Sequence, residues 1–285
     1  QNMFLTLTDL GNHVVSKTKN IDKYIYYFHA PVSTTKQYTA TAFDNYDVIL
    51  CNGDYHLSEI RKRESIKKIK KKKLIKSGYF YFDYLNNKIN KKIEANEILI
   101  APSWNYKSKN FINENLEEII QSALNGGHTV KFRPHPESLK RSMLTINNLL
   151  KKFSNKNFIL DETSENINSM EKAKCLITDS SGIAIEFVLL FKRPTLYFED
   201  IDKIHNTEFD NFKDLITIEK NVKNTFGYTF KPENIKDLNA LISKSLVEFT
   251  NKDIEIKNFI EKNFYNYGAT VKNFNDLISR SIWIF

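Results

Sequence analysis

The stretch CLITDSSGIAIEFVLL, Cys175–Leu190, carries the strongest fold signal in this chain of 285 residues. Its first four residues predict a buried strand, and the residues from about 182 to 190 predict a helix. The polar residues Asp179, Ser180 and Ser181 lie between the two, in the N-cap region of that helix. A strand that turns directly into a helix is typical of a β-α unit in a parallel sheet.

The same alternation of short β-rich runs and amphipathic stretches extends from about Ile98 onward. We expect strands at 98–103, 128–134, 158–160, 175–178 and 195–198, and helices at 113–124, 138–153, 167–172 and 182–190. This order predicts parallel strands with right-handed crossovers, hence a doubly wound α/β sheet. The C-terminal third, from Glu233, predicts helices. The first 90 residues offer strand candidates only at 4–7, 24–28 and 48–51, which are too few β-α units for a full second sheet.

Composition describes an ordinary globular protein, with 41% hydrophobic and 27% charged residues. The longest apolar run, Ile183–Phe191, is interrupted by Glu186 and is far shorter than the about 20 residues of a membrane span. Cys51 and Cys175 lie in or beside apolar runs, which predicts buried free thiols and a reducing cytoplasm. The chain starts at Gln1, so we expect that the true N-terminus has been cut away.

The net charge of +8 is concentrated in one run, RKRESIKKIKKKKLIK, Arg61–Lys76. Its ten Lys and Arg and one Glu sum to +9, so the rest of the chain sums to −1. The run resembles a helix. It is compatible with a solvated basic surface, with adsorption to anionic lipid headgroups, or with nucleic-acid binding. The third is disfavoured because no aromatic residues interleave with the lysines, which in the core of the run are Lys67, Lys68, Lys70, Lys71, Lys72 and Lys73.

Ligands of an open parallel sheet bind beyond the carboxyl ends of its strands, so polar residues at these positions are site candidates. In KFRPHPES, Lys131–Ser138, two prolines fix an extended turn that holds His135 beside Arg133. A histidine held rigidly among cations suits a phosphate, although a surface histidine without a role is the simpler alternative.

The turn after Thr178 is the second candidate. The tandem serines and Gly182 meet the N-terminus of the following helix, where free N–H groups and the helix dipole favour an anion. Capping alone would produce a similar sequence. Glu186, one helical turn further on, is either a buried partner for a ligand hydroxyl or a boundary residue.

A third, weaker candidate is His29, which follows an aromatic-rich strand and could act as a general base. Other chemistries lack support, because the chain contains no GxGxxG, P-loop or GxSxG motif. The segment DNYD, 44–47, precedes a strand and is not interpreted as a metal site. Four further histidines have no metal-ligating partner at i+4 and are interpreted as structural or surface residues: His13, His56, His128 and His205.

Six segments together resemble the CDP-glycerol glycerophosphotransferase family, the teichoic-acid polymerases and their capsule-synthesis relatives. They are FHAPVSTTK (28–36), NYDVIL (45–50), GYFYFD (78–83), APSWN (101–105), RPHP (133–136) and TDSSG (178–182). The pair RPHP and TDSSG is the specific part of the match, since both order and spacing agree with the family.

The resemblance implies a GT-B-like fold with two Rossmann-like domains. We expect a partial N-terminal acceptor-side domain at 1–92, a nucleotide-donor domain at 93–265 and a return helix at 266–285. In the family's terms, His29 would be the base that deprotonates the acceptor hydroxyl, and His135 would stabilise the charge that develops as CMP leaves. The donor phosphates would be bound by the set Ser103, Arg133, Asp179, Ser180, Ser181, Gly182 and Glu186. A metal-independent reaction without a cofactor is expected.

The predicted function is transfer of a glycerol-phosphate or related unit from a CDP-activated donor to a surface polymer or lipid-linked acceptor. The enzyme would be cytoplasmic and peripheral at the inner face of the membrane, with the basic run on anionic lipid and no nucleic-acid partner. Two alternatives stay open. One is a GT-B transferase that uses a CMP- or UDP-sugar, and the other is a non-catalytic nucleotide- or membrane-binding scaffold.

Overall fold

The computed structural model describes residues 1–12, 15–90, 92–104, 115–154, 156–199 and 203–282. The chain forms two compact units. Unit 1 contains Gln1–Asn87, Lys203–Asn221 and Lys257–Phe285, and unit 2 contains Lys88–Asp202 and Val222–Ile256. The chain therefore passes between the two units several times.

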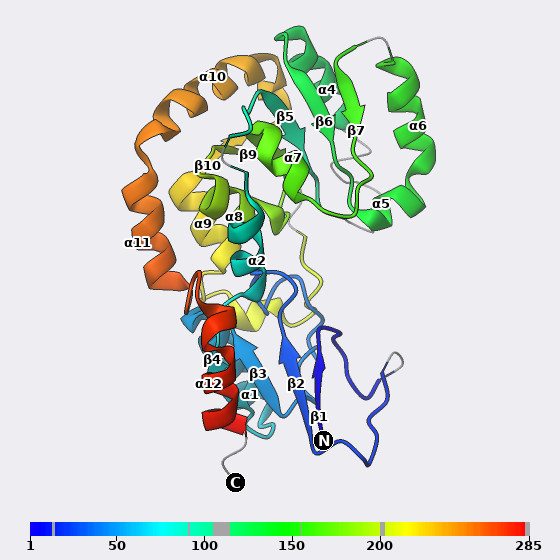
Figure 1. Ribbon diagram of the computed structural model, residues 1–285. Helices are drawn as coiled ribbons and strands as arrows, with labels where there is room; N and C mark the ends of the chain where they lie inside the picture. The colour runs from blue at the N-terminus through cyan, green and yellow to red at the C-terminus, as the bar shows by residue number, and fades with distance from the viewer. Residues whose placement is uncertain (13–14, 91, 105–114, 155, 200–202, 283–285) are drawn as a thin grey trace. The chain divides into compact units, whose positions relative to one another are not determined.

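Unit 1 is built on a four-stranded parallel sheet of order β1-β2-β3-β4 (Figure 1). The strands are β1 (Asn2–Leu5), β2 (Lys23–Tyr27), β3 (Val48–Cys51) and β4 (Lys73–Lys76). The helices are α1 (Asp54–Lys67), α2 (Phe80–Lys88) and α12 (Thr270–Ile282), with a 3-10 turn at Phe209–Phe212. The first 90 residues thus form a four-stranded sheet, with β4 added to the three strands that the sequence predicted.

The basic run is not one helix, which corrects the sequence-based expectation. Helix α1 ends at Lys67, and Lys68 takes a left-handed conformation with φ 53° that stops the helix. Strand β4 follows, and it pairs in parallel with β3, with Leu74 opposite Ile49 and Ile75 opposite Leu50.

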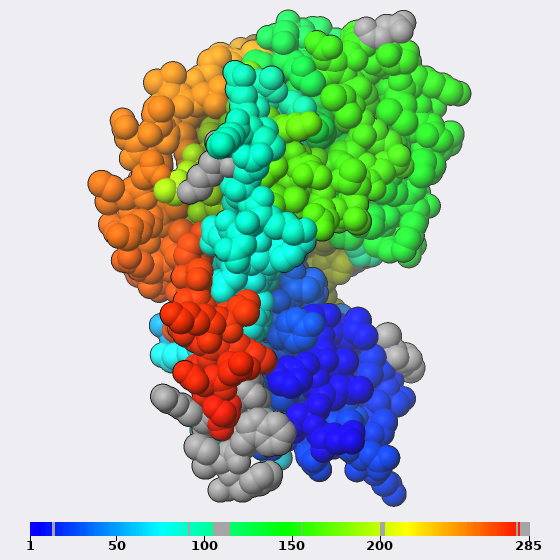
Figure 2. Space-filling model, in the orientation of Figure 1, coloured from blue at the N-terminus to red at the C-terminus, as the bar shows by residue number. Residues whose placement is uncertain are grey.

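Helix α12 covers one face of this sheet. Its Phe274 and Leu277 pack against Ile25, Val48 and neighbouring apolar side chains of the strands. Phe274 also meets Phe4 of β1 edge to face, with ring centroids 6.0 Å apart. Figure 2 shows this packing as red atoms of α12 against blue atoms of the N-terminal segment.

Unit 2 contains a six-stranded parallel sheet of order β10-β9-β8-β5-β6-β7 (Figure 1). Its strands are β5 (Glu97–Ile100), β6 (Thr129–Phe132), β7 (Phe158–Leu160), β8 (Ala173–Thr178), β9 (Thr195–Phe198) and β10 (Gly227–Phe230). The chain builds outward from β5 to β7, and then outward from β8 to β10 on the other side. This is the doubly wound order with a switch point between β5 and β8.

Helices surround this second sheet. They are α4 (Leu116–Asn125), α5 (Pro136–Arg141), α6 (Met143–Lys152), α7 (Ile167–Lys172), α8 (Ile183–Glu186), which continues as a π-helical turn at Phe187–Phe191, and α10 (Leu238–Glu248). Further 3-10 turns lie at Pro232–Asp237 and Phe249–Asn251, while α9 (Ile218–Phe226) and α11 (Asp253–Asn263) each contribute residues to both units. Residues 113 and 114 of the helix expected at 113–124 lie outside the described residues.

The core of unit 2 holds fully buried strand residues such as Ile98, Val130 and Ile177, with Ile119 and Phe153 from the helices. Both faces of β5 are buried, and its burial is continuous along the strand. Such continuous burial is expected for a parallel sheet that has helices on both faces. The core therefore makes the strand ends at the switch point a rigid base for ligand contacts.

Candidate active site

The switch point of unit 2 is closed by contacts between the ends of β5 and β8. The backbone N–H and the hydroxyl of Ser103 each donate to the Asp179 carboxylate, at 2.7 Å in both cases. The Thr178 hydroxyl donates to the carbonyl of Ala101 at 2.7 Å. Ser103 and Asp179, both expected at the donor site, therefore lie together at the edge of the sheet where ligands bind.

The turn after β8 leads straight into α8. Ser180, Ser181 and Gly182 are each half-buried, and Gly182 has helical dihedral angles, with φ −61°. Glycine is therefore not required here for a left-handed backbone. The turn places two hydroxyls and the first N–H groups of a nine-residue helical segment, Ile183–Phe191, at one point, which suits an anion.

Glu186 is buried, with 6% of its surface exposed. Its Oε2 accepts a hydrogen bond of 3.2 Å from the side chain of Asn166, just before α7. Glu186 is therefore buried rather than at a boundary, and its expected contact with a ligand hydroxyl stays a prediction.

Arg133 of the RPHP turn contacts the protein itself. Its guanidinium forms an ion pair of 2.8 Å with Asp161 and also donates to Thr163. Burial would raise the pKa of Asp161, but hydrogen bonds from Ser169, Thr163 and Arg133 outweigh it and lower the pKa to about 2. Since this pair neutralises much of its charge, Arg133 is better placed to brace the turn than to carry a free positive charge.

His135 is exposed and caps α5. Its Nδ1 accepts a hydrogen bond of 3.1 Å from the backbone N–H of Glu137, and its ring lies 6.5 Å from that of Trp104. Because Nδ1 acts as an acceptor, the neutral ring carries its proton on Nε2. His135 can thus offer an N–H donor to an anion.

His29 follows β2 in unit 1, and its ring donates a hydrogen bond where the Nδ1 of His135 accepts one. Its surface is exposed, but neighbouring atoms desolvate the ring enough to lower its pKa, while a hydrogen bond with the backbone of Thr6 acts against this. A ring N–H that donates to a carbonyl leaves the second ring nitrogen without a proton. His29 therefore has the character of a base near neutral pH.

The segment that follows His29 is held by side chains that the sequence did not single out. Tyr79 donates to the His29 carbonyl at 2.9 Å, and His56 Nε2 donates to the Val32 carbonyl at 2.8 Å. His56 is fully buried and stacks on Phe28, and burial lowers its pKa to about 3, so it is neutral. The available signal was a histidine at the start of a helix, four residues after Asn52, whose backbone N–H donates to the Nδ1 of His56.

The lysines of the basic run divide into two kinds. Lys67, Lys68, Lys70, Lys71 and Lys73 are exposed, and Lys67 forms an ion pair of 2.8 Å with Glu208. Lys72 is only 6% exposed, and burial lowers its pKa, so it does not belong to a basic surface.

The remaining histidines do not gather around a metal. Among the described residues, no group of three or more His, Cys, Asp or Glu side chains could hold an ion. His128 is half-buried, and His205 donates its backbone N–H to Lys36. His13 lies outside the described residues. Cys51 and Cys175 are buried free thiols, as expected.

A family model described as CDP-glycerol:poly(glycerophosphate) glycerophosphotransferase matches residues 25–213, which is more than half of the chain. The chain belongs to this family. It is therefore a transferase that moves glycerol phosphate from a CDP-activated donor, which confirms the predicted class of activity. No curated protein matches the chain.

Solved structures support the fold. The wall teichoic acid polymerase TagF, in a variant form, has a TM-score of 0.61 and 16% identity, with 99% of this chain and 73% of that chain covered. TagF after a CDPG soak has a TM-score of 0.59 and 19% identity, with 99% and 72% covered. S. aureus MnaA with UDP has a TM-score of 0.57 and 11% identity, with 93% and 69% covered. The GT-B prediction is confirmed.

Proposed function

We propose that this glycerophosphotransferase uses His29 as the general base for the acceptor hydroxyl and His135 as the N–H donor that stabilises the departing CMP. The acceptor oxygen attacks the phosphorus of the glycerol-phosphate unit, and the P–O bond to CMP breaks. The hydroxyl proton passes to the unprotonated nitrogen of His29. The observation that carries this assignment is which ring nitrogen the backbone hydrogen bonds leave over, a nitrogen without a proton on His29 and an N–H on His135.

The other donor residues would act around His135. Ser180, Ser181 and the N–H groups near Gly182 would bind the phosphates, with the helix dipole adding to the attraction. Asp179 would hold Ser103, and Arg133 would brace the RPHP turn. Glu186 is buried and bonded to Asn166, which supports a role behind the phosphate site rather than in it. Catalysis without a metal is our expectation, and retention of activity in EDTA tests it.

A thermal-shift panel tests the donor site. We expect CDP-glycerol, CDP and CMP to raise the melting temperature, because a ligand that binds only the native state stabilises it by mass action. The shifts should shrink in His135→Ala. A preference for UDP or UDP-sugars would favour the sugar-transferase alternative, and a donor-induced shift without CMP release would favour the scaffold.

The exposed lysines are proposed to hold the enzyme against an anionic membrane at the cytoplasmic face, where a lipid-linked acceptor or a capsular polymer would be extended. No helix in the described part of the chain is long and apolar enough to cross a membrane. Each lysine near an anionic surface contributes about 1 kcal/mol. Sedimentation with vesicles that contain anionic lipid is the test, and equal binding to neutral vesicles would contradict the proposal.

A further inference from the structure

The segment after His29 buries three consecutive hydroxyl side chains. Ser33, Thr34 and Thr35 are 0%, 7% and 2% exposed. Buried polar groups require hydrogen-bond partners, because an unpaired one is destabilising. The partners of this segment therefore determine where its backbone lies.

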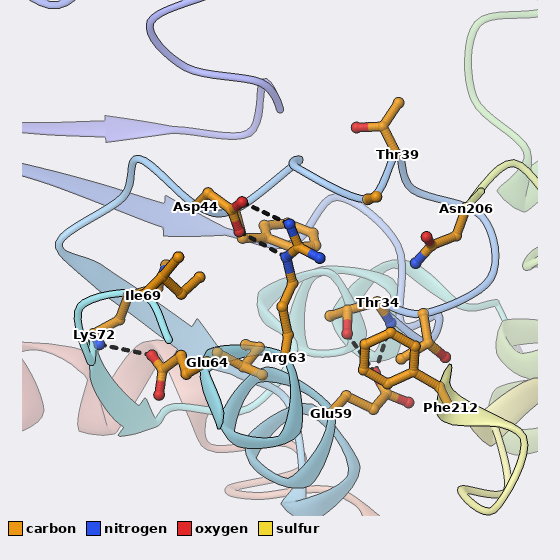
Figure 3. A pocket seen from close by; sticks show the side chains of 14 residues that line it. Thr34, Thr39, Asp44, Glu59, Arg63, Glu64, Ile69, Lys72, Asn206 and Phe212 are labelled. Atoms are coloured by element: carbon orange, nitrogen blue, oxygen red, sulfur yellow. Dashed lines mark hydrogen bonds and ion pairs between the residues drawn. The ribbon is translucent and has the colours of Figure 1, made fainter. Parts of the chain in front are cut away.

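Glu59 on α1 supplies most of these partners. Its side chain is 2% exposed, and one carboxylate oxygen accepts the hydroxyl of Ser33. The other oxygen accepts both the backbone N–H and the hydroxyl of Thr34, each at 2.7 Å (Figure 3). A single carboxylate thus binds three donors in two adjacent residues.

Two neighbours of Glu59 on the same helix bind the preceding backbone. The Tyr55 hydroxyl donates to the carbonyl of Pro31 at 3.2 Å, and His56 donates to that of Val32. Helix α1 consequently contacts four successive residues, 31–34, directly after the residue pair His29–Ala30. The carbonyl of His29 itself is bound by Tyr79.

A second, half-buried carboxylate faces the segment from α9. Glu219 accepts the backbone N–H of Ser33 at 3.2 Å and the side-chain amide of Gln37 at 3.4 Å. Ser33 therefore lies between two carboxylates.

We infer that Glu59 is a positioning residue for His29, which deepens the catalytic role proposed above and rests on it. Its carboxylate fixes Ser33 and Thr34, and through the short connection to His29 it sets the direction of the base. A displacement of about 1 Å in such a group can lower a rate about 10²-fold.

The charge state of Glu59 gives the inference a specific signature. Burial and the charge of Glu219 raise the pKa of Glu59 to about 7, although the hydrogen bonds from Ser33 and Thr34 act against this. Tyr55 and Cys51 also interact with the charge of Glu59. Burial raises the pKa of Glu219, while Lys36 acts against this. Four charged side chains line the same pocket as Glu59: Asp44, Arg63, Glu64 and Lys72 (Figure 3). Protonation of Glu59 replaces one acceptor site by a donor, so the segment loses part of its anchorage below neutral pH.

The test compares kcat as a function of pH in Glu59→Gln, Glu64→Gln, His29→Asn and the wild type, with CMP release as the readout. Glu64 is the matched control, because it is 3% exposed on the same helix and binds Lys72 N–H and Arg61 instead. We expect Glu59→Gln to lower kcat about tenfold or more with little change in KM for CDP-glycerol. In this variant the acid limb of the kcat–pH profile should move to lower pH, because His29 is then the only one of the two groups that still titrates.

Two results would overturn the inference: an acid limb of the kcat–pH profile in Glu59→Gln that is the same as in the wild type, or a kcat loss in Glu64→Gln as large as that in Glu59→Gln. The proposed function would stay intact in both cases if His29→Asn is inactive. Full activity of His29→Asn would instead remove the proposed function. If Glu59→Gln does not fold, Thr34→Val, which deletes only one of the donors, takes its place. We expect a smaller kcat loss in that variant, and an unchanged kcat in it would contradict the inference.

Discussion

The two candidate catalytic histidines are held in different ways. His135 sits in a short turn between two prolines and bonds to a residue two positions away. His29 precedes a segment that is anchored by Glu59 and Glu219, which are 26 and 186 residues from Ser33 along the chain. His135 is thus held by its local sequence, and His29 by packing between elements that are distant along the chain.

The largest expected effect comes from removing either histidine. General acid–base groups contribute about 10²–10⁴-fold to a rate, so His29→Asn and His135→Asn should each lower kcat by that order. The two variants should differ in their binding of CDP-glycerol, because only His135 is proposed to contact the donor. His29→Asn should keep the thermal shift caused by CDP-glycerol, whereas His135→Asn should weaken it. Equal weakening of donor binding in both variants would contradict the separation of roles.

The difference in anchoring explains which features could be predicted from sequence. TDSSG and RPHP each combine a strand end with a turn, so local patterns predict the β-α units of the doubly wound sheet of unit 2. Ser103 and Asp179 are distant in the sequence and meet because the carboxyl ends of the parallel strands β5 and β8 lie at the same edge of the sheet. The contact between Glu59 and Ser33 has no local pattern. Periodicity also failed in the basic run, because the left-handed turn at Lys68 and the pairing of β4 with β3 depend on the rest of the sheet. The assignment of domains to 1–92, 93–265 and 266–285 stays a prediction.

The second prediction concerns stability and pH in unit 1. The pKa of Glu59 is about 7 in the folded chain against 4.5 for an ordinary glutamate, so the folded state binds this proton more tightly. Between these two values, its contribution to the free energy of unfolding therefore falls as pH rises, by about 3 kcal/mol in total. Glu59→Gln should remove this slope when urea unfolding is measured from pH 4.5 to 8. A slope that persists in the variant would show that other groups cause it.

The third prediction tests the contact between the ends of β5 and β8 in unit 2. Asp179→Asn removes the charge that accepts both hydrogen bonds of Ser103, and bonds to charged groups contribute about 1.5–3 kcal/mol. We expect a loss of this size in the free energy of unfolding or in donor affinity, read from denaturant melts with and without CDP-glycerol. Asp161→Asn is the control, since it breaks the Arg133 pair and leaves Ser103 bonded. Equal losses of donor affinity in Asp179→Asn and Asp161→Asn, with no loss of stability in either, would contradict the contribution assigned to the Ser103–Asp179 contact.

The smallest effect per residue is expected on the membrane. At about 1 kcal/mol for each lysine near an anionic surface, the pair Lys70→Gln and Lys71→Gln should reduce vesicle binding roughly 30-fold at low salt. Lys72→Gln should have a different outcome, because this side chain is buried beside Glu64 in unit 1 and its loss should lower stability instead. Matched surface changes at Lys257 and Lys262, both exposed on α11, control for net charge. If those controls reduce binding as much as the pair does, the attraction reflects total charge and not the run that follows α1.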